Sequence, residues 1–175
     1  MAYESYGPGV YGPYFVAGAP VAGTNAVQTV TFGGTITGGS FTLSLDGVST
    51  GAITHTGAAM TGAAMATAMN AALDAKFGTA QIVASAGSFA AGVGTMLLTF
   101  SGSNAAKRAW SAMTASSALT GTAPTIAVAI TTPGVEATGR NAPKGALVVD
   151  VTNGKSYQTT GPAGAPVWGL VGAQT

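Results

Sequence analysis

Two stretches in the first third of the chain place apolar side chains at every second position. These stretches are residues 27–32 and residues 41–45. A period of two residues is typical of a strand with one buried face. The segment TITGG at 35–39 lies between them, and its glycines accept positive φ, so it predicts a turn between two antiparallel strands. A second turn is expected in DGVSTG, followed by a short strand in GAITH.

The spacing of apolar residues changes to a helical period over residues 61–77. The apolar stripe recurs every four positions and consists of Met65, Met69, Leu73 and Phe77. Thr61 is suited to the N-cap and Gly78 to the position after the last turn. Closely spaced methionines can also form an adaptable binding groove. Because Leu73 and Phe77 continue the same stripe, we expect core packing of one amphipathic helix on a sheet.

Three later runs predict further strands, at 80–87, 95–102 and 124–134. Residues 103–123 are less regular and predict a loop with one helical turn. The fold class expected for residues 25–134 is therefore α+β, mainly antiparallel β as a sheet or sandwich, with the helix packed on it.

Residues 1–24 combine aromatic side chains with prolines and glycines, a mixture that disfavours both helix and ladder pairing. We predict an extended arm that docks on another surface, because exposed aromatic area is unfavourable. An unattached tail is the alternative. The candidate contacts of this arm with another subunit are Tyr3, Tyr6, Tyr11, Tyr14 and Phe15.

A short linker at 135–144 leads to a small C-terminal unit at 145–175. Alternation on both sides of Asn153 and Gly154 predicts a β-hairpin, since Asn-Gly suits the tight turn of a hairpin. The segment APVWGLV predicts a third strand. About 30 residues are too few for independent stability. We expect this unit to pack on the main domain or on another copy.

Ionisable residues are scarce in the 175-residue chain. It has six Lys and Arg, five Asp and Glu and one His, for a net charge of +1. A charged fraction of 6% compares with about 25% in average soluble proteins. Near-zero charge favours association, so we expect the protein to belong to an assembly. The N-terminus lacks a secretory pattern and no apolar run is long enough for a membrane span, which predicts synthesis in the cytoplasm and no membrane partner.

The chain offers few residues for catalysis. There are no cysteines, which excludes disulfides, thiolate ligands and cysteine nucleophiles. His55 and Asp46 could belong to a triad, but a triad also needs a positioned nucleophile, and no GxSxG segment exists. The acids are scattered, so neither a carboxylate pair nor a metal site is indicated. We predict no enzyme and no cofactor, with His55 on the polar face of a strand end.

Nucleotide and nucleic-acid binding are also disfavoured. The glycine pairs lack the strand–GxGxxG–helix context of a dinucleotide site. Lys107 and Arg108 beside Trp110 could contact phosphate and stack on a base. Two cations are far fewer than the roughly 6–10 phosphate contacts of a typical binder. A solvated loop with a packed tryptophan is the stronger interpretation, without specific nucleic acid.

Two segments resemble proteins of tailed bacteriophages. The run NAVQTVTFGGTITGGSFTLSLDG, with MNAALDAKFG and PTIAVAITTPG later in the chain, resembles a domain of phage structural proteins over about 110 residues. The segment APKGALVVDVTNGKSYQTTGPAGAPVW resembles an ending of phage head-associated and fibre proteins. Its matching positions are Gly145, Asp150, Gly154, Lys155, Tyr157 and Trp168, whereas Ala146 stands where that ending usually has a hydroxyl.

The resemblance implies a virion component without catalytic residues. The short chain and its arm favour a capsid decoration, or cement, protein that binds the assembled head through the major capsid protein and stabilises it. Closed symmetry at a lattice point suggests a homotrimer on the capsid surface. The alternative is a tail or fibre-associated module that binds a host surface or glycan, although fibre proteins are usually longer and repetitive.

Overall fold

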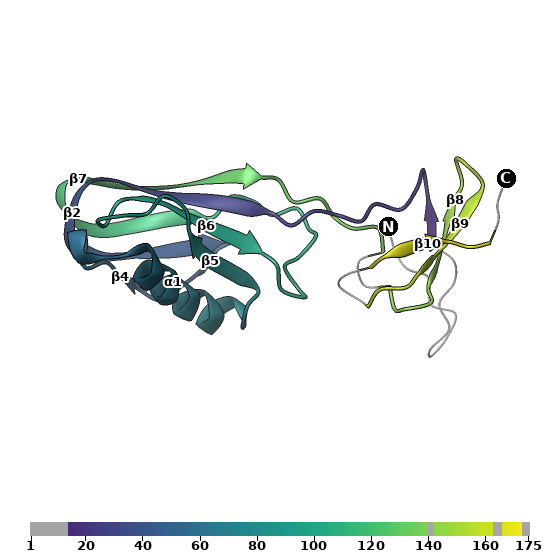
Figure 1. Ribbon diagram of the computed structural model, residues 1–175, viewed down its shortest axis with the longest axis horizontal. Coiled ribbons are helices and arrows are strands. Elements are labelled where there is room, and N and C mark those ends of the chain that lie inside the picture. Colours follow the sequence, from purple (N-terminus) through teal and green to yellow (C-terminus); the bar gives the residue numbers. More distant parts are fainter. Residues whose placement is uncertain (1–13, 140–141, 163–165, 173–175) are drawn as a thin grey trace. The chain divides into compact units, whose positions relative to one another are not determined.

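The computed structural model describes residues 14–139, 142–162 and 166–172, and the chain divides into two compact units (Figure 1). The larger unit is Asn25–Gly134. The smaller unit combines Met1–Thr24 with Val135–Thr175, so both ends of the chain contribute to it. Over the described residues the fold of the chain is α+β, mainly antiparallel β with one helix packed on the sheet of the larger unit, as the sequence predicts.

Two strands of 19 residues each form the framework of the larger unit. β2 (Val27–Leu45) pairs antiparallel with β7 (Thr114–Thr132) along one edge over most of its length. The opposite edge of β2 pairs in turn with three strands, all antiparallel. These are β6 (Gly94–Phe100), β4 (Ile53–Thr54) and β3 (Val48–Ser49). β5 (Ile82–Ala86) continues the sheet beyond β6.

The β2–β7 ribbon folds back on itself, and its halves form two layers (Figure 1). Phe32 and Phe41 lie nine positions apart in β2, which would separate them by about 30 Å in a straight strand. Their ring centroids are instead 5.1 Å apart, in an edge-to-face contact. The turn predicted at 35–39 is therefore wrong. β2 bends there through register shifts while its pairing with β7 continues.

Glycines permit this bend because the two backbones approach too closely for side chains. Gly34 has φ +77°, and a Cβ at this position would lie 2.0 Å from the carbonyl oxygen of Ala123. Gly121 on the partner strand has φ +139°, and a Cβ there would lie 1.9 Å from the carbonyl oxygen of Thr35. Glycine is needed for both its conformation and its lack of volume.

The loop predicted at 103–123 is correct only in its first part. Residues 114–123 form the first half of β7 and pair with the second half of β2. This segment, TASSALTGTA, consists mostly of small residues without apolar alternation, so its strand depends on the partner rather than on its own pattern.

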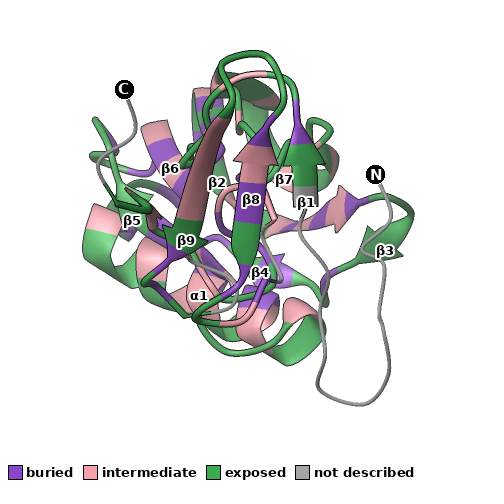
Figure 2. Cartoon of the chain, turned by 90° about the vertical axis from the view of Figure 1, so that its right-hand side faces the viewer, coloured by how far each residue is buried: buried purple, intermediate pink, exposed green. Residues whose placement is uncertain are grey.

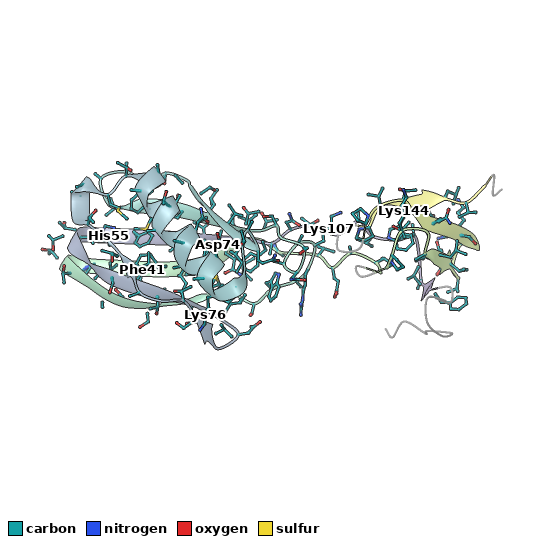
Figure 3. The ribbon with its side chains drawn as sticks, turned by 90° about the horizontal axis from the view of Figure 1, so that it is seen from below. Phe41, His55, Asp74, Lys76, Lys107 and Lys144 are labelled. Carbon is teal, nitrogen blue, oxygen red and sulfur yellow. The ribbon has the colours of Figure 1, made fainter. Side chains whose placement is uncertain are left out.

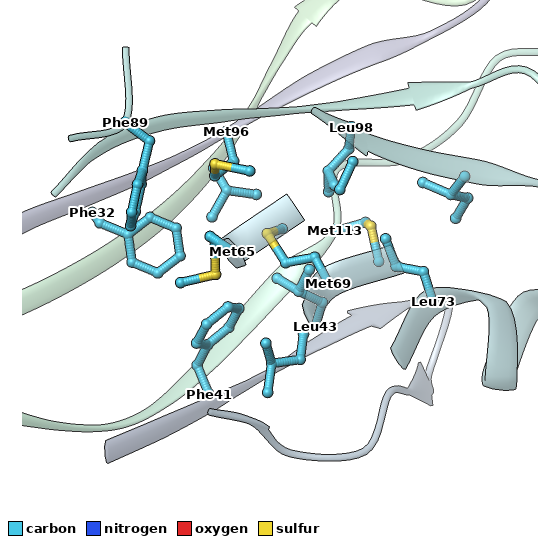
Figure 4. Packing of buried hydrophobic residues seen from close by; sticks show 14 of the residues in the cluster. Phe32, Phe41, Leu43, Met65, Met69, Leu73, Phe89, Met96, Leu98 and Met113 are labelled. Carbon is cyan, nitrogen blue, oxygen red and sulfur yellow. The ribbon is translucent and has the colours of Figure 1, made fainter. Parts of the chain in front are cut away.

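The one α-helix among the described residues, α1 (Gly62–Phe77), agrees with the predicted helix, and a 3₁₀ turn, η1 (Gly57–Ala59), precedes it. Thr61 Oγ1 accepts a hydrogen bond of 3.2 Å from the N–H of Ala64, and Gly78 follows the last turn with φ +95°. The buried face of α1 consists of Met65, Met69 and Leu73. These side chains pack among Phe41, Leu43, Met96 and Leu98, which confirms the core interpretation of the methionines (Figure 4).

The smaller unit is a four-stranded sheet with the order β1-β8-β9-β10. The predicted hairpin is present as β8 (Leu147–Asp150) and β9 (Lys155–Thr159), with Gly154 at φ +64° in the turn. The predicted third strand is β10 (Trp168–Leu170). The fourth strand, β1 (Tyr14–Val16), comes from the segment predicted as an arm and pairs parallel with β8.

The linker segment is also tied to the N-terminal part of the chain. Thr24 and Val135 exchange two backbone hydrogen bonds of 2.9 Å, and the N–H of Thr138 bonds the carbonyl of Val21. These pairs join residues more than a hundred positions apart, which no local sequence pattern reveals. The small hairpin therefore gains its additional strand from within the same chain.

Candidate contact surface

His55 is a buried structural residue of the larger unit (Figure 3). Its Nδ1 accepts a hydrogen bond of 3.0 Å from the N–H of Gly57, so the ring hydrogen is on Nε2, which donates to the carbonyl of Gly92 at 2.8 Å. The ring contacts Phe32 and Phe89, with centroids 5.7 and 6.0 Å away. The prediction that His55 lies on a polar face is wrong, because its ring is buried on the apolar side of the sheet, against Phe32 and Phe89.

The acids predicted as scattered are engaged separately. Asp46 Oδ1 accepts a hydrogen bond from the hydroxyl of Ser111, and Asp74 Oδ1 accepts one of 2.8 Å from the N–H of Ala80. Each carboxylate thus fixes a loop of the larger unit, and neither bonds His55. Within residues 14–139, 142–162 and 166–172, no three His, Cys, Asp or Glu side chains gather where they could hold a metal ion.

Trp110 is packed rather than available for stacking. Its Nε1 donates a hydrogen bond of 2.9 Å to the carbonyl of Ala105, and its ring centroid lies 5.6 Å from that of Phe100. The guanidinium of Arg108 lies over the ring, 4.5 Å from its centroid. The aromatic that would be needed to stack on a base therefore already has protein contacts on its faces.

Asp150 organises the smaller unit through four hydrogen bonds. Its Oδ1 accepts from the N–H groups of Gly18, Thr152 and Asn153, and its Oδ2 accepts from the side-chain amide of Asn153 at 2.7 Å. Burial raises the pKa of this carboxyl, but the four donors favour the charged form and outweigh burial, so the pKa lies below its ordinary value. Asp150 is thus a fixed structural anion.

Most exposed large apolar side chains of the described residues belong to the smaller unit. Eight of the ten lie there, and only Val48 and Ile130 belong to the larger unit. The eight are Phe15, Val21, Val135, Leu147, Val151, Val167, Leu170 and Val171. This distribution marks the smaller unit as the more apolar surface.

Strand register places two of these eight residues, together with the partly exposed Val149, on one face of the smaller sheet. Phe15 lies opposite Val149 in the β1–β8 pair, and Leu147 is two residues from Val149 on the same side of β8. We call this side the outer face, formed by Phe15, Leu147, Val149, Ser156, Gln158 and Gly169. By the same register the opposite side carries the buried residues Val16, Val148, Asp150 and Thr159. Figure 2 shows the buried residues of β8 in purple.

The outer face contains no ionisable side chain. Phe15 is 58% exposed and Leu147 is 42% exposed, and Val149 between them is partly exposed. Of the predicted arm contacts, Phe15 therefore lies on this face. Tyr14 contributes its backbone to β1, whereas Tyr3, Tyr6 and Tyr11 lie outside the described residues.

Three amide side chains that bond the backbone were not identified from the sequence; Gln28 is buried, and Asn25 and Asn70 are partly buried. Gln28 donates to the carbonyl of Ser111 and accepts from the N–H of Met113, both at 2.7 Å. Asn25 Oδ1 accepts from the N–H of Lys107, and Asn70 bonds both backbone groups of Ala84. The signal for Gln28 was available, because it occupies an apolar-face position of an alternating strand.

No family model matches the chain, and no curated protein matches it. In the part of the chain that the structure describes, no helix has both the length and the apolar character that crossing a membrane requires.

Proposed function

We propose that the protein is a non-catalytic virion component, a capsid decoration protein that binds the assembled head through its smaller unit. The observation that carries this proposal is the neutral, apolar outer face built on Phe15, Leu147 and Val149. The two sequence resemblances to phage structural proteins support a virion as the particle. The proposed partner is the major capsid protein. The proposed location is the capsid surface.

The physical basis is contact area rather than charge. Covering apolar surface contributes about 25 cal/mol per Å², and such contacts are weakly affected by salt. A ligand that binds the assembled shell but not its separated subunits stabilises the shell by RT ln(1 + [L]/Kd). With many identical sites on one shell, a modest affinity at each site is sufficient. Self-association into a homo-oligomer would multiply these contacts further.

Co-sedimentation with undecorated heads tests the proposal. Phe15→Ser and Leu147→Ser should each raise the Kd for heads at least tenfold, while the wild-type Kd should change little between 50 mM and 500 mM salt. Val48→Ser, which alters an apolar residue 44% exposed in the larger unit, is the matched control and should bind normally. Point variants are preferable to removal of residues 1–24, because that deletion also removes β1 from the sheet.

Two outcomes would contradict the proposal. Normal head binding by both Ser variants would exclude the outer face as the contact. Wild-type protein that ignores heads but binds host cells or glycans would instead support the tail or fibre-associated module.

A further inference from the structure

β7 is an edge strand over its whole length. Among the described residues it forms its backbone ladder with β2 alone. Within the part of the chain that the structure describes, its side-chain hydrogen bonds reach only Thr29 and Thr37 of β2, or stay within β7 itself. A strand that is paired on one side directs alternate N–H and C=O groups outward, where they can accept another strand.

The other end of the sheet is closed by a specific device. Asn70 projects from α1 to β5, where its Oδ1 accepts from the N–H of Ala84 at 2.7 Å and its Nδ2 donates to the carbonyl of Ala84 at 3.0 Å. One amide side chain thus occupies both outward backbone groups of Ala84, at the middle of the edge that an incoming strand would use. β5 is protected in the way natural sheets usually protect an edge, by a covering helix.

β7 has little comparable protection. It contains no Lys, Arg, Asp or Glu, and its single proline, Pro124, lies at the bend. Residues 125–132, sequence TIAVAITT, follow the proline. From Ile126 to Ile130 a β-branched residue alternates with alanine, and threonines lie at both ends. Such a segment has high β-propensity and no charge, which makes it a favourable template for strand addition.

The core is also incompletely covered along this segment. Ile126 and Val128 pack against the core but remain partly exposed, and Ile130 on the same side of the strand is 40% exposed. A neighbouring strand beside β7 would cover these three side chains and pair the outward backbone groups at the same time.

We propose that a second copy of this chain pairs its own β7 antiparallel with Thr125–Thr132 around a two-fold axis, forming one continuous sheet. A head-to-tail contact of β7 with β5 is disfavoured because Asn70 blocks β5. A two-fold contact brings a segment against itself, which like charges would oppose, and this segment carries none. The pair has two-fold symmetry, in contrast to the trimer expected from the sequence. This inference does not rest on the proposed function.

Sedimentation equilibrium of the full chain, over a 100-fold concentration range, tests the pairing. The wild type should reach a dimer and no larger species. Ala129→Lys and Ala129→Glu place a charge at an exposed position of β7, and each should raise the dimer Kd at least tenfold. An equimolar mixture of the two variants should recover dimer, a result that misfolding would not produce. Thr31→Lys adds the same charge to the neighbouring strand, opposite Ala127, and should leave the dimer intact.

Several results would overturn the inference. These are a wild type that stays monomeric throughout the range, open-ended aggregation in place of a dimer, and a dimer unaffected by both Ala129 variants. Loss of the dimer in Phe15→Ser but not in Ala129→Lys would assign self-association to the outer face instead. Head binding is measured separately with different variants, so failure of the pairing and failure of the proposed function remain distinguishable.

Discussion

Asp150 accepts a hydrogen bond of 2.8 Å from the backbone N–H of Gly18, which lies 132 positions earlier in the chain. The same oxygen accepts from the turn residues Thr152 and Asn153. One carboxylate therefore joins the segment after β1 to the β8–β9 turn. The structure thus gives Asp150 a physical role in holding the smaller unit together.

This arrangement predicts an acid-sensitive smaller unit. The pKa of Asp150 is lower in the folded state than in the unfolded state, so its contribution to the free energy of unfolding is complete above the unfolded value of about 3.9. That contribution is lost as the pH falls through the lower folded-state pKa. NMR of the indole N–H of Trp168, which bonds the carbonyl of Thr138, should report loosening of this unit below about pH 4.

Asp150→Asn provides the test of this assignment. The variant should weaken the smaller unit at neutral pH and reduce its further loss of stability in acid. Asp74→Asn removes a carboxylate from the larger unit and should leave the Trp168 signal unchanged. An unaltered acid profile in Asp150→Asn would contradict the role assigned to Asp150.

His55 should matter for stability because of its burial. His55→Ala removes a buried ring and leaves the N–H of Gly57 and the carbonyl of Gly92 without their partner, so we expect a loss of about 3 kcal/mol in the free energy of unfolding. Urea unfolding measures this loss. Thr54→Ala, at the exposed neighbouring position, should change stability by less than about 0.5 kcal/mol. Equal effects of the two substitutions would contradict the structural role of His55.

Elements specified by local chemistry could be predicted from the sequence. α1 has a four-residue stripe with a cap at each end, and the β8–β9 hairpin has Asn-Gly in its turn. The bend of β2 could not be predicted, because glycines that permit a bulge also permit a turn. A bulge forms in place of a turn when β7 stays paired with β2 through the bend, and that pairing is set by tertiary structure.

The outer face of the smaller unit was predictable only in part. The aromatic composition of the N-terminal segment drew attention to Phe15, but its neighbours Leu147 and Val149 come from the far end of the chain. Parallel pairing of β1 with β8 brings them together, and no short-range signal encodes that pairing. The same holds for Asn70, whose role depends on how α1 lies against β5.

Gln28 should be more important than its polar character suggests. Gln28→Met keeps a similar volume but leaves the N–H of Met113 and the carbonyl of Ser111 unpaired in the interior, and we expect a loss of about 2–4 kcal/mol. Gln158→Met makes the same change at an exposed position and should be nearly neutral. Thermal unfolding followed by circular dichroism would compare the two, and a neutral Gln28→Met would show that the interior can repack around these groups.

The bend of the β2–β7 ribbon allows conformational strain to be separated from steric conflict. Gly34 and Gly47 have similar φ values of +77° and +83°, so an alanine at either position adopts an unfavourable left-handed conformation that costs about 1–2 kcal/mol. A Cβ at Gly47 meets no heavy atom within 4 Å, whereas one at Gly34 would lie 2.0 Å from the carbonyl oxygen of Ala123. Only Gly34→Ala must push the two strands apart.

Gly34→Ala should therefore lower the free energy of unfolding by about 1–3 kcal/mol more than Gly47→Ala, the usual cost of overpacking. Chemical denaturation of the two variants measures the difference, and hydrogen exchange should show increased opening along the β2–β7 ladder near the bend in Gly34→Ala alone. If both variants lost the same stability, the close approach of Gly34 to Ala123 would be refuted, and with it the bend that brings Phe32 against Phe41. The two-layer core of the larger unit depends on that bend.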